Sequence, residues 1–444
     1  VDTYTITYSD NTTSTFTITN GKNGTNGQDA EKVTIEEIYE ALTLKGYTKS
    51  FDEFLKEYLN YEFSVSEKTA SINTAIMSTV SIYSEFQVIT QQAVGFFETK
   101  EVKTTSVGAG SGVIYKLDKE KGDAYIITNY HVVFNNSANT KIGKIHVFLY
   151  GSLIDVAYKN DGNGNYVYDE SGYPIVLYGQ DAIECTYIGG SLNYDIAVLK
   201  ISNNETLKES NATAVKISEN YVVGDTAIAI GNPEAKGISV TEGIVSVESE
   251  YIKMTGADET TQVVFRTLRI DTAINSGNSG GGLFNEKGEL IGIVNAKIID
   301  SAIENIAYAI PRDIVINVAD NLIYNYEASG TNKVKKITIG LTLNIDSSMA
   351  VYNNGTKTVS IVEQVSIINV DAGSLGESAG FMTGDVLKSI TINDKTTEIN
   401  RMFNAIDLAL TIKVGDSLTY TILRDGVETN ITFTATSSAF SFVE

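Results

Sequence analysis

The sequence of 444 residues contains little cysteine, histidine, proline or basic charge. Its single cysteine, Cys185, excludes an internal disulfide framework, and no zinc-site spacing occurs, so we expect no cofactor. No run of about 18 apolar residues indicates a membrane span. With 33 Lys and Arg against 55 Asp and Glu, the net charge is −22, which favours solubility and argues against nucleic acid or anionic lipid as a partner.

A glycine-rich turn contains a serine whose hydroxyl one of the two histidines could activate. Residues 277–282 read Gly-Asn-Ser-Gly-Gly-Gly, with Ser279 inside the run. Glycine tolerates positive φ, so the turn can direct backbone N–H groups to one point beside the hydroxyl. We therefore predict an oxyanion hole formed by Gly277, Asn278 and Ser279. A serine hydroxyl is a weak nucleophile until a base takes its proton.

His131 is the better candidate for that base. It ends an apolar run, whereas alternation places His146 opposite the apolar face of its strand, and we predict that His146 is solvated. Asp195 brings one charge into an apolar strand, which is costly unless the carboxylate orients the imidazole. Taken singly, His131 fits a core histidine and Asp195 an exposed strand cap. Together with Ser279, in the chain order of the chymotrypsin template, they predict a catalytic triad.

Six segments around these residues follow one another in a recognisable order: 110–114, 128–133, 195–200, 231–233, 243–246 and 271–281. They resemble the trypsin-like protease domain of the HtrA/DegP family, and one departure is Gly282, where many relatives carry proline. The resemblance implies a mainly β, chymotrypsin-like domain of two six-stranded barrels over residues 70–325. It also implies a serine endopeptidase with a Ser-His-Asp acyl-enzyme mechanism, and a homotrimer.

The same resemblance implies which residues line the substrate pocket. Ala273, six positions before the serine, lies at the base, with Asn295, Ala296 and Ile306 along the edge. No acidic residue occupies the base to pair with arginine or lysine. We therefore expect cleavage of misfolded or surface proteins after small or medium aliphatic residues.

Residues 334–437 have short alternating strands, two short helix-like stretches and turn signals. They predict a separate α+β domain that resembles a PDZ domain, in which Ile339, Gly340 and Leu341 form the loop that binds a terminal carboxylate. Such domains bind peptide C-termini by adding them as a strand to a sheet edge. Alone, these three residues fit an ordinary strand glycine, but their position after a trypsin-like domain favours the PDZ interpretation.

The first part of the chain belongs to neither domain. Residues 1–31 combine a predicted β-hairpin with a spacer in which glycine recurs at every third position, too few times for a collagen helix. Residues 32–63 predict a two-helix unit, because two capping-box patterns precede apolar residues at helical spacing. This part resembles spacers of Gram-positive surface proteins. We expect an exported bacterial protein, extracellular or at the cell surface.

Two alternatives stay open at this stage. Asp161, Asn163, Asn165 and Asp169 alternate as calcium ligands do, but tyrosine and glycine stand where an EF-hand requires glycine and glutamate, so a hairpin turn is favoured. For the whole chain, the alternative to a protease is a catalytically silent surface-binding or adhesion protein. It would work through the PDZ groove and the N-terminal stalk, and the intact triad argues against it.

Overall fold

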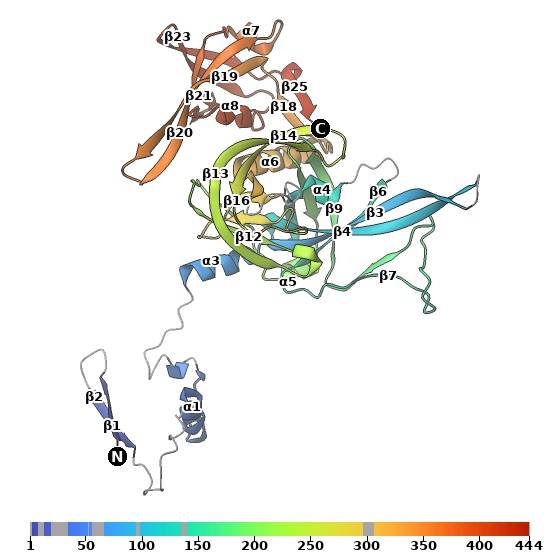
Figure 1. Cartoon of the computed structure of the whole chain (residues 1–444), viewed down its shortest axis with the longest axis vertical. Coiled ribbons are helices and arrows are strands. Elements are labelled where there is room, and N and C mark those ends of the chain that lie inside the picture. The colour runs from blue at the N-terminus through green and yellow to red at the C-terminus, as the bar shows by residue number, and fades with distance from the viewer. Residues whose placement is uncertain are drawn as a thin grey trace. The chain divides into compact units, whose positions relative to one another are not determined.

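The computed structural model describes residues 2–7, 13–18, 34–51, 53–55, 66–94, 98–134, 140–295 and 306–443. Contacts divide the chain into two compact units, Val1–Val65 and Ser66–Glu444 (Figure 1). In the first unit, β1 (Asp2–Thr7) and β2 (Thr13–Ile18) pair antiparallel as the predicted hairpin. The repeated glycines that follow lie outside the described residues.

The helix α1 (Ile35–Leu44) shows why this part of the sequence is helical. The Thr34 hydroxyl accepts from Glu37 N–H, and the Glu37 carboxylate accepts from Thr34 N–H at 2.8 Å, so two N–H groups at the helix start are satisfied. The next helical stretch follows Ser50, whose N–H donates to the Glu53 carboxylate at 2.8 Å. Both predicted capping boxes are therefore present.

The first barrel closes through six strands in the order β10-β5-β4-β3-β6-β9. Their bounds are β3 Thr79–Ala93, β4 Thr99–Asp118, β5 Asp123–Asn129, β6 Thr140–Leu149, β9 Ile183–Ser191 and β10 Ile196–Ile201. Residues such as Ile82, Ile114 and Ile126 are fully buried inside it. Ile196, the first residue of β10, pairs with Asn129, the last residue of β5, so the residues just outside these two strand ends meet at one rim.

The second barrel is a sheet in the order β11-β16-β15-β12-β13-β14-β17, and pairing of β16 with β17 closes six of its strands. The bounds are β11 Lys216–Ile217, β12 Thr226–Gly231, β13 Ser239–Thr255, β14 Gln262–Ile270, β15 Gly282–Phe284, β16 Glu289–Val294 and β17 Ala307–Pro311. The strand β15 begins directly after the glycine-rich turn. The predicted chymotrypsin-like double barrel is therefore confirmed.

Short helices and one two-stranded sheet complete the part of the second unit that surrounds the barrels. They are α3 Glu67–Ile76, α4 Tyr130–Val133, α5 Glu205–Glu209, the 3₁₀ turn Pro233–Ala235, β7 Val156–Tyr158 and β8 Val176–Tyr178. The pair β7–β8 belongs to an insertion that packs on the long β3–β4 hairpin, which extends beyond the barrel (Figure 1). Thr105 in this hairpin donates from its hydroxyl to Pro174 O at 2.8 Å, and Tyr158 OH donates to Thr105 O.

This insertion corrects the prediction that His146 is solvated. The imidazole of His146 is buried, with 7% of the residue exposed, and stacks on the Tyr178 ring at 3.7 Å between centroids. Burial lowers the pKa of His146, an effect that Glu184 opposes. Alternation in β6 does place His146 opposite the core residues Ile145 and Val147, but the Tyr178 ring of the 151–180 insertion covers it.

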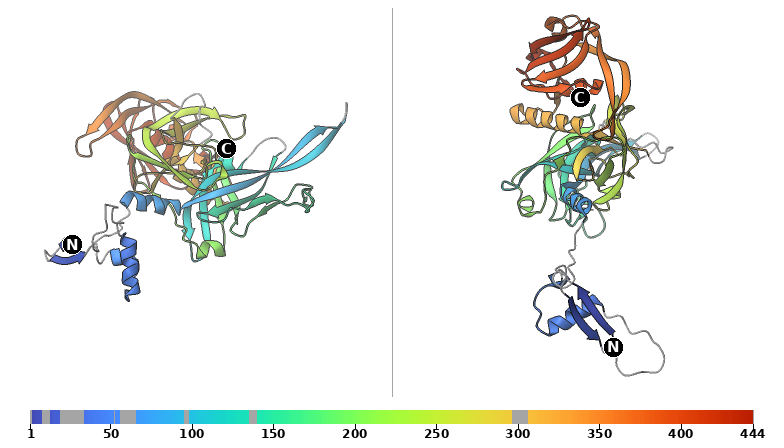
Figure 2. Two further views of the ribbon diagram at one scale, coloured as in Figure 1. Left: turned by 60° about the horizontal axis from the view of Figure 1, so that its bottom comes forward. Right: turned by 90° about the vertical axis from the view of Figure 1, so that its left-hand side faces the viewer.

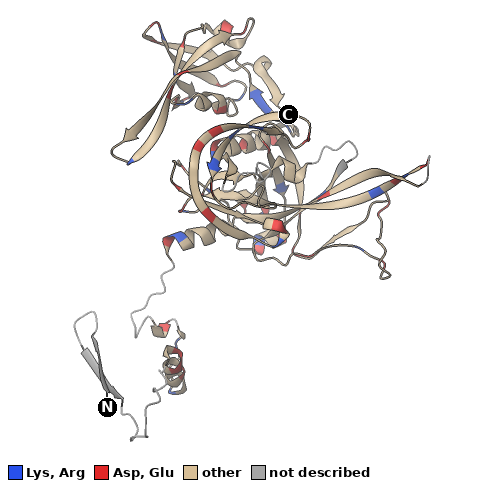
Figure 3. Cartoon of the chain, in the orientation of Figure 1, with Lys and Arg blue, Asp and Glu red and all other residues tan. Residues whose placement is uncertain are grey.

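The C-terminal region contains a mixed strand and helix arrangement after α6 (Arg312–Ser329). Its sheet has the order β19-β20-β21-β23-β24, with β22 paired to β21, and β18 pairs with β25. The bounds are β18 Val334–Ile337, β19 Leu341–Asn353, β20 Thr358–Val370, α7 Leu375–Ala379, β21 Val386–Ile392, β22 Lys395–Glu398, α8 Met402–Leu408, β23 Ser417–Arg424, β24 Val427–Thr434, the 3₁₀ turn Ser437–Ala439 and β25 Phe440–Val443. The strand β18 carries two adjacent lysines (Figure 3).

The helix α6 lies between the barrels and the C-terminal sheet (Figure 2). One apolar cluster contains Val113 of the first barrel, Ile230 of the second, Leu322 of α6 and Leu410 of the C-terminal region. A second contact is ionic: Arg266 in β14 donates to Asp407 in α8 at 2.5 Å, and both residues are buried. The two barrels and the C-terminal region therefore share one buried interface through α6 and α8.

Candidate active site

His131 stands at the rim where β5 and β10 meet, in the one-turn helix α4. The chain here is held by Asp195, whose carbonyl accepts from Tyr130 N–H and from Asn129 Nδ2, both at 3.0 Å. The His131 side chain is 17% exposed, so the imidazole is accessible from outside while most of it packs against protein. Its position follows from the register of β5 and β10.

Asp195 lies beside His131 and is almost completely buried. Its Oδ2 lies 2.7 Å from His131 Nδ1, and its Oδ1 accepts from His131 N–H at 3.0 Å. The residue has φ +48°, a left-handed conformation that aspartate tolerates better than most residues. With 3% of the residue exposed, the alternative of an exposed strand cap does not apply.

Asn295 is a partner of Asp195 that the sequence did not reveal. It follows β16 of the second barrel, is fully buried, and donates from Nδ2 to Asp195 Oδ2 at 2.8 Å. The sequence assigned Asn295 to the edge of the substrate pocket. No sequence signal marks its contact with Asp195, because the two residues are 100 positions apart and meet only when the barrels pack.

The glycine-rich turn depends on two left-handed glycines. Gly277 has φ +95°, and a Cβ there would lie 2.3 Å from Asn232 O. Gly280 has φ +83°, and its Cβ would lie 2.2 Å from both Ser111 O and Thr128 Oγ1. Any side chain at either position would collide with neighbouring strands, which explains the glycines on both sides of the serine.

Some backbone N–H groups of this turn donate hydrogen bonds within the protein and others do not. Asn278 N–H donates to Asn275 O at 3.1 Å, and Gly280 N–H donates to Val294 O at 3.1 Å. Over the described part of the chain, Gly277 N–H and Ser279 N–H donate to no acceptor. Of the three residues predicted to form the oxyanion hole, Gly277 and Ser279 therefore have an available N–H, whereas the N–H of Asn278 between them is bonded.

Ser279 is bonded to β4, the neighbour of the strand that leads to His131. Its carbonyl accepts from Ser111 N–H of β4 at 2.8 Å, and the hydroxyl of Thr128 in β5 donates to Ser111 O at 2.7 Å. Among the described residues, no hydrogen bond joins Ser279 to the imidazole of His131. Such bonds are often long without substrate and tighten when it binds. Ser279 itself is 7% exposed.

The predicted pocket residues are only partly described. Ala273 is exposed, and its carbonyl accepts from Thr241 Oγ1 at 2.8 Å. Ile306 is half-buried immediately before β17, and Ala296 lies outside the described residues. Asn295 directs its amide to Asp195, as described above.

The predicted carboxylate-binding loop lies at the start of β19. Gly340 has φ +82°, and a Cβ there would lie 2.3 Å from Ser374 Cβ. Ile339 O accepts from Gly376 N–H at 2.8 Å, which fixes the loop against α7. The strand β19 is at one edge of its sheet, and α8 contacts it.

The Asn/Gly-rich insertion forms tight turns in which the candidate calcium ligands bond within the loop. Asp161 Oδ1 accepts from the N–H groups of Asn163 and Asn165 at 2.8 and 3.1 Å, and Asp169 Oδ1 accepts from Tyr173 N–H. Over the described residues no group of three or more acidic, histidine or cysteine side chains is arranged to hold a metal ion. These turns agree with the favoured hairpin, and calcium binding stays the untested alternative.

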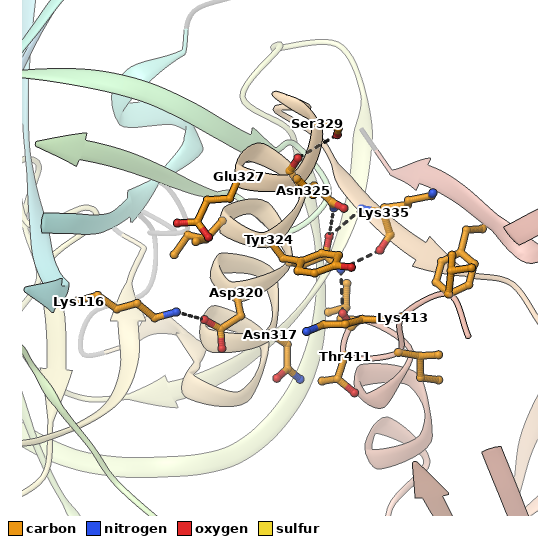
Figure 4. Close-up of a pocket in the computed structure, with 17 residues that line it drawn as sticks. Lys116, Asn317, Asp320, Tyr324, Asn325, Glu327, Ser329, Lys335, Thr411 and Lys413 are labelled. Carbon is orange, nitrogen blue, oxygen red and sulfur yellow. Dashed lines mark hydrogen bonds and ion pairs between the residues drawn. The ribbon is translucent and has the colours of Figure 1, made fainter. Parts of the chain in front are cut away.

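A pocket of about 630 Å³ lies away from the candidate site, between α6, β18 and residues 410–414 (Figure 4). Lys116 and Asp320 form an ion pair of 2.7 Å at one end, and the Asn321 amide, also in the lining, donates to Leu410 O at 2.8 Å. None of the predicted catalytic residues lines this pocket. It belongs to the junction between α6 and the C-terminal region.

The fold and the site define a trypsin-like serine peptidase, and comparison with known proteins agrees. Residues 110–293 match the family described as trypsin-like peptidase domain. The chain is 30% identical over 329 residues to the serine protease Do-like HtrA of Lactococcus lactis subsp. cremoris, covering 71% of this chain and 68% of that protein. It is 30% identical over 371 residues to the serine protease Do-like HtrA of Bacillus subtilis, covering 82% and 71%.

Among solved structures, the HtrA-type protease AlgW with decapeptide is 22% identical, covers 86% of this chain and 99% of its own, and has a TM-score of 0.46. The curated relatives show that this chain belongs to the HtrA family of serine proteases. It is a serine endopeptidase that acts on protein substrates. In the described residues, no helix is both long and apolar enough to cross a membrane.

Proposed function

We propose that Ser279, His131 and Asp195 are the nucleophile, the general base and the orienting acid of this protease. Ser279 Oγ attacks the carbonyl carbon of the scissile peptide bond, while His131 Nε2 takes the hydroxyl proton and then gives it to the leaving amine. Water, deprotonated by His131, hydrolyses the acyl-enzyme. Asp195 holds Nδ1, so Nε2 is the nitrogen that exchanges the proton, and the carboxylate stabilises the imidazolium.

The observation that carries this proposal is the bonding of Asp195. Its carboxylate contacts both His131 Nδ1 and His131 N–H and accepts from Asn295 Nδ2, all within 3.0 Å. This arrangement fixes the imidazole in one tautomer and one orientation, at the rim against which the Ser279 turn packs. Geometry of this kind supports a role as base more strongly than the burial of any one residue.

The oxyanion of the tetrahedral intermediate would be held by Gly277 N–H and Ser279 N–H, which have no other acceptor within the described residues. Asn278 links the two donors through its backbone. The substrate residue before the cut would contact Ala273, Ala296 and Ile306. Because the base offers no acidic group, small or medium aliphatic side chains are favoured.

We propose that residues 334–437 form a PDZ-like domain that binds peptide C-termini, following a protease domain at residues 70–325. The edge strand β19 offers unpaired backbone groups, and α8 forms the other wall of the groove. Ile339, Gly340 and Leu341 would bind the terminal carboxylate. Residues 1–31 and 32–63 act as a spacer and a two-helix unit of an exported, surface-associated protein, and the homotrimer is carried over from the resemblance.

The triad is tested with a fluorophosphonate probe and a quenched peptide that contains valine or alanine before the cut. The wild-type protein should be labelled at Ser279 and cleave the peptide, and Ser279→Ala should lose both activities. Ser276→Ala, an exposed serine in the same turn, is the matched control and should keep both. Unlabelled wild-type protein would instead favour the catalytically silent surface-binding protein.

The PDZ-like groove is tested by titrating free-acid and C-terminally amidated copies of one hydrophobic peptide. The free acid should bind at least tenfold more tightly, because only it offers a carboxylate to the loop. Gly340→Val should remove this difference, since φ +82° and the nearby Ser374 side chain leave no place for its branched side chain. Equal affinity of both peptides for the wild-type protein contradicts carboxylate capture.

A further inference from the structure

Ser111 of the first barrel uses its polar atoms to hold the nucleophile turn of the second barrel. The residue lies in β4 and is fully buried. Its hydroxyl donates to Gly277 O at 2.7 Å and accepts from Asn232 N–H at 2.8 Å, and its N–H donates to Ser279 O at 2.8 Å. One side chain therefore connects three segments at the boundary between the barrels.

These bonds hold the carbonyls of the two residues that flank Asn278, Gly277 and Ser279. Ser111 binds the carbonyls of Gly277 and Ser279, and Glu234 N–H binds Ser276 O at 2.8 Å. A carbonyl and the N–H of the same peptide unit point in opposite directions, so the bonds from Ser111 orient the peptides that carry Asn278 N–H and Gly280 N–H. The peptide between them, which carries Ser279 N–H, is oriented by the bond from Gly281 N–H to Asn278 O at 2.9 Å. Glu234 N–H sets the peptide that contains Gly277 N–H.

The turn has little other side-chain support. Asn278 Oδ1 is buried and has no hydrogen-bond partner in the described part of the chain, and the same is true of Asn232 Nδ2. The Asn278 oxygen therefore does not anchor the turn. The Ser111 hydroxyl is the side-chain group that bonds to Gly277 O and to the neighbouring loop at Asn232.

We propose that the Ser111 hydroxyl is a positioning residue for the oxyanion hole: it holds Gly277 and the 232–234 loop in the arrangement that leaves Gly277 N–H and Ser279 N–H directed to the reaction centre. This inference rests on the proposed catalytic role of Ser279. Ser111 touches neither substrate nor the reacting atoms. Its removal would leave Gly277 O and Asn232 N–H buried without partners, and the turn would relax to bond them elsewhere.

The loss of the Ser111 hydroxyl should affect kcat rather than KM, because the oxyanion forms only after substrate has bound. Its donors act on the tetrahedral intermediate and hardly on bound substrate, so misplacing them lowers kcat and leaves KM nearly unchanged. Deleting one oxyanion donor typically costs about 10²–10³ in kcat. A donor that is displaced rather than deleted should cost less, about 10- to 100-fold.

The experiment compares the full-length wild type with Ser111→Ala and with Ser84→Ala as matched control. Ser84 is a buried serine of the adjacent strand β3, and its hydroxyl has no partner among the described residues. Kinetics with a quenched peptide are measured at a temperature at which circular dichroism shows every variant folded. We expect Ser111→Ala to lower kcat about 10- to 100-fold with KM within about twofold, and Ser84→Ala to keep both.

A second readout separates positioning from general support. A peptide boronate forms a tetrahedral adduct with the serine and should bind Ser111→Ala more weakly by the factor lost in kcat, whereas a product peptide should bind equally. Wild-type kcat in Ser111→Ala, or equal losses in boronate and product affinity, overturns the proposal. If Ser111→Ala does not fold, Ser111→Cys, with its weaker donor, replaces it: lowered kcat at unchanged KM supports the proposal and wild-type kcat overturns it.

The proposed function and this inference fail in different ways. If the wild-type protein shows no cleavage that depends on Ser279, the triad assignment fails. If cleavage depends on Ser279 but the hydroxyl of Ser111 can be removed without a change in kcat, only the positioning role fails. Peptide-cleavage kinetics of the wild type, Ser279→Ala and Ser111→Ala therefore distinguish the two results.

Discussion

Two buried carboxylates of the first barrel, Asp195 and Glu85, have different surroundings. Asp195 contacts His131 Nδ1 and accepts from His131 N–H and Asn295 Nδ2, all within 3.0 Å. Glu85, in the long β3–β4 hairpin, is about as buried but has a bond of 3.5 Å from Lys144 N–H. Strong hydrogen bonds around a buried charge indicate a site that the fold maintains, whereas burial with weak bonds mainly costs stability.

The largest effect is expected from a substitution of Asp195, the carboxylate with the stronger hydrogen bonds. Asp195→Asn should lower kcat about 10⁴-fold, the loss seen in the chymotrypsin template, because an amide in place of the carboxylate holds the imidazole in the wrong tautomer. Asparagine tolerates φ +48°, so the unfolding midpoint should change little. Hydrolysis of the quenched peptide and thermal unfolding measure the two. Activity within tenfold of wild type would show that Asp195 is not the acid.

A third buried carboxylate, Asp407, extends the comparison to the junction with the C-terminal region. Its partner is Arg266, which also lies over the Phe403 ring at 4.2 Å. Arg266→Met should destabilise the second unit by about 3–5 kcal/mol, because it leaves a buried charge without its cation. Chemical denaturation measures the loss, and adding Asp407→Asn to Arg266→Met should restore part of it. No recovery in the double variant contradicts an ionic contact.

Substitution of Asn295 tests how much one hydrogen bond to Asp195 contributes. Asn295→Ala removes the donor to Asp195 Oδ2 and should lower kcat about 10- to 100-fold, the cost of one unmade bond to a charged group. Asn295→Ser keeps a donor and is the matched control, with a smaller loss. The pair is compared by kcat and KM on one substrate. Equal kcat in Asn295→Ala and wild type would show that this bond does not matter for the reaction.

The smallest effect concerns Glu85. Burial raises the pKa of Glu85, an effect that Lys144 and Tyr178 oppose and Glu184 reinforces. A carboxyl with a raised folded-state pKa stabilises the fold when protonated, and this contribution is lost as pH rises from the unfolded value of about 4.3 through the folded one. Glu85→Gln should therefore be more stable than wild type at pH 7, with the difference vanishing towards pH 4. Chemical denaturation at pH 7 and pH 4 measures the difference in unfolding free energy between the variant and the wild type. A difference that grows towards pH 4 would contradict a raised pKa of Glu85.

The sequence predicted much of the fold, and it named residues that the structure brings together in the candidate site. The glycine-rich turn, the histidine after an apolar run and the aspartate before an apolar strand each have a local signature, because turns and buried strands are specified by neighbouring residues. His146 was predicted wrongly, since the alternation of its own strand does not show that Tyr178, 32 positions further on, folds back over it. Asn295 was predicted for the pocket edge, and its bond to Asp195 has no local signature.

The amino-acid sequence by itself determined the strand pattern, the turn that accepts positive φ, and the family to which the chain belongs, since these depend on residue types at short spacing. Only the tertiary structure decided which groups support the proposed catalytic residues. The Ser111 hydroxyl meets Gly277, and Asn295 meets Asp195, across the boundary of two barrels. Hydrogen bonds require positions within about 3 Å, and between residues 100 or more apart in the chain only packing of the barrels sets those positions.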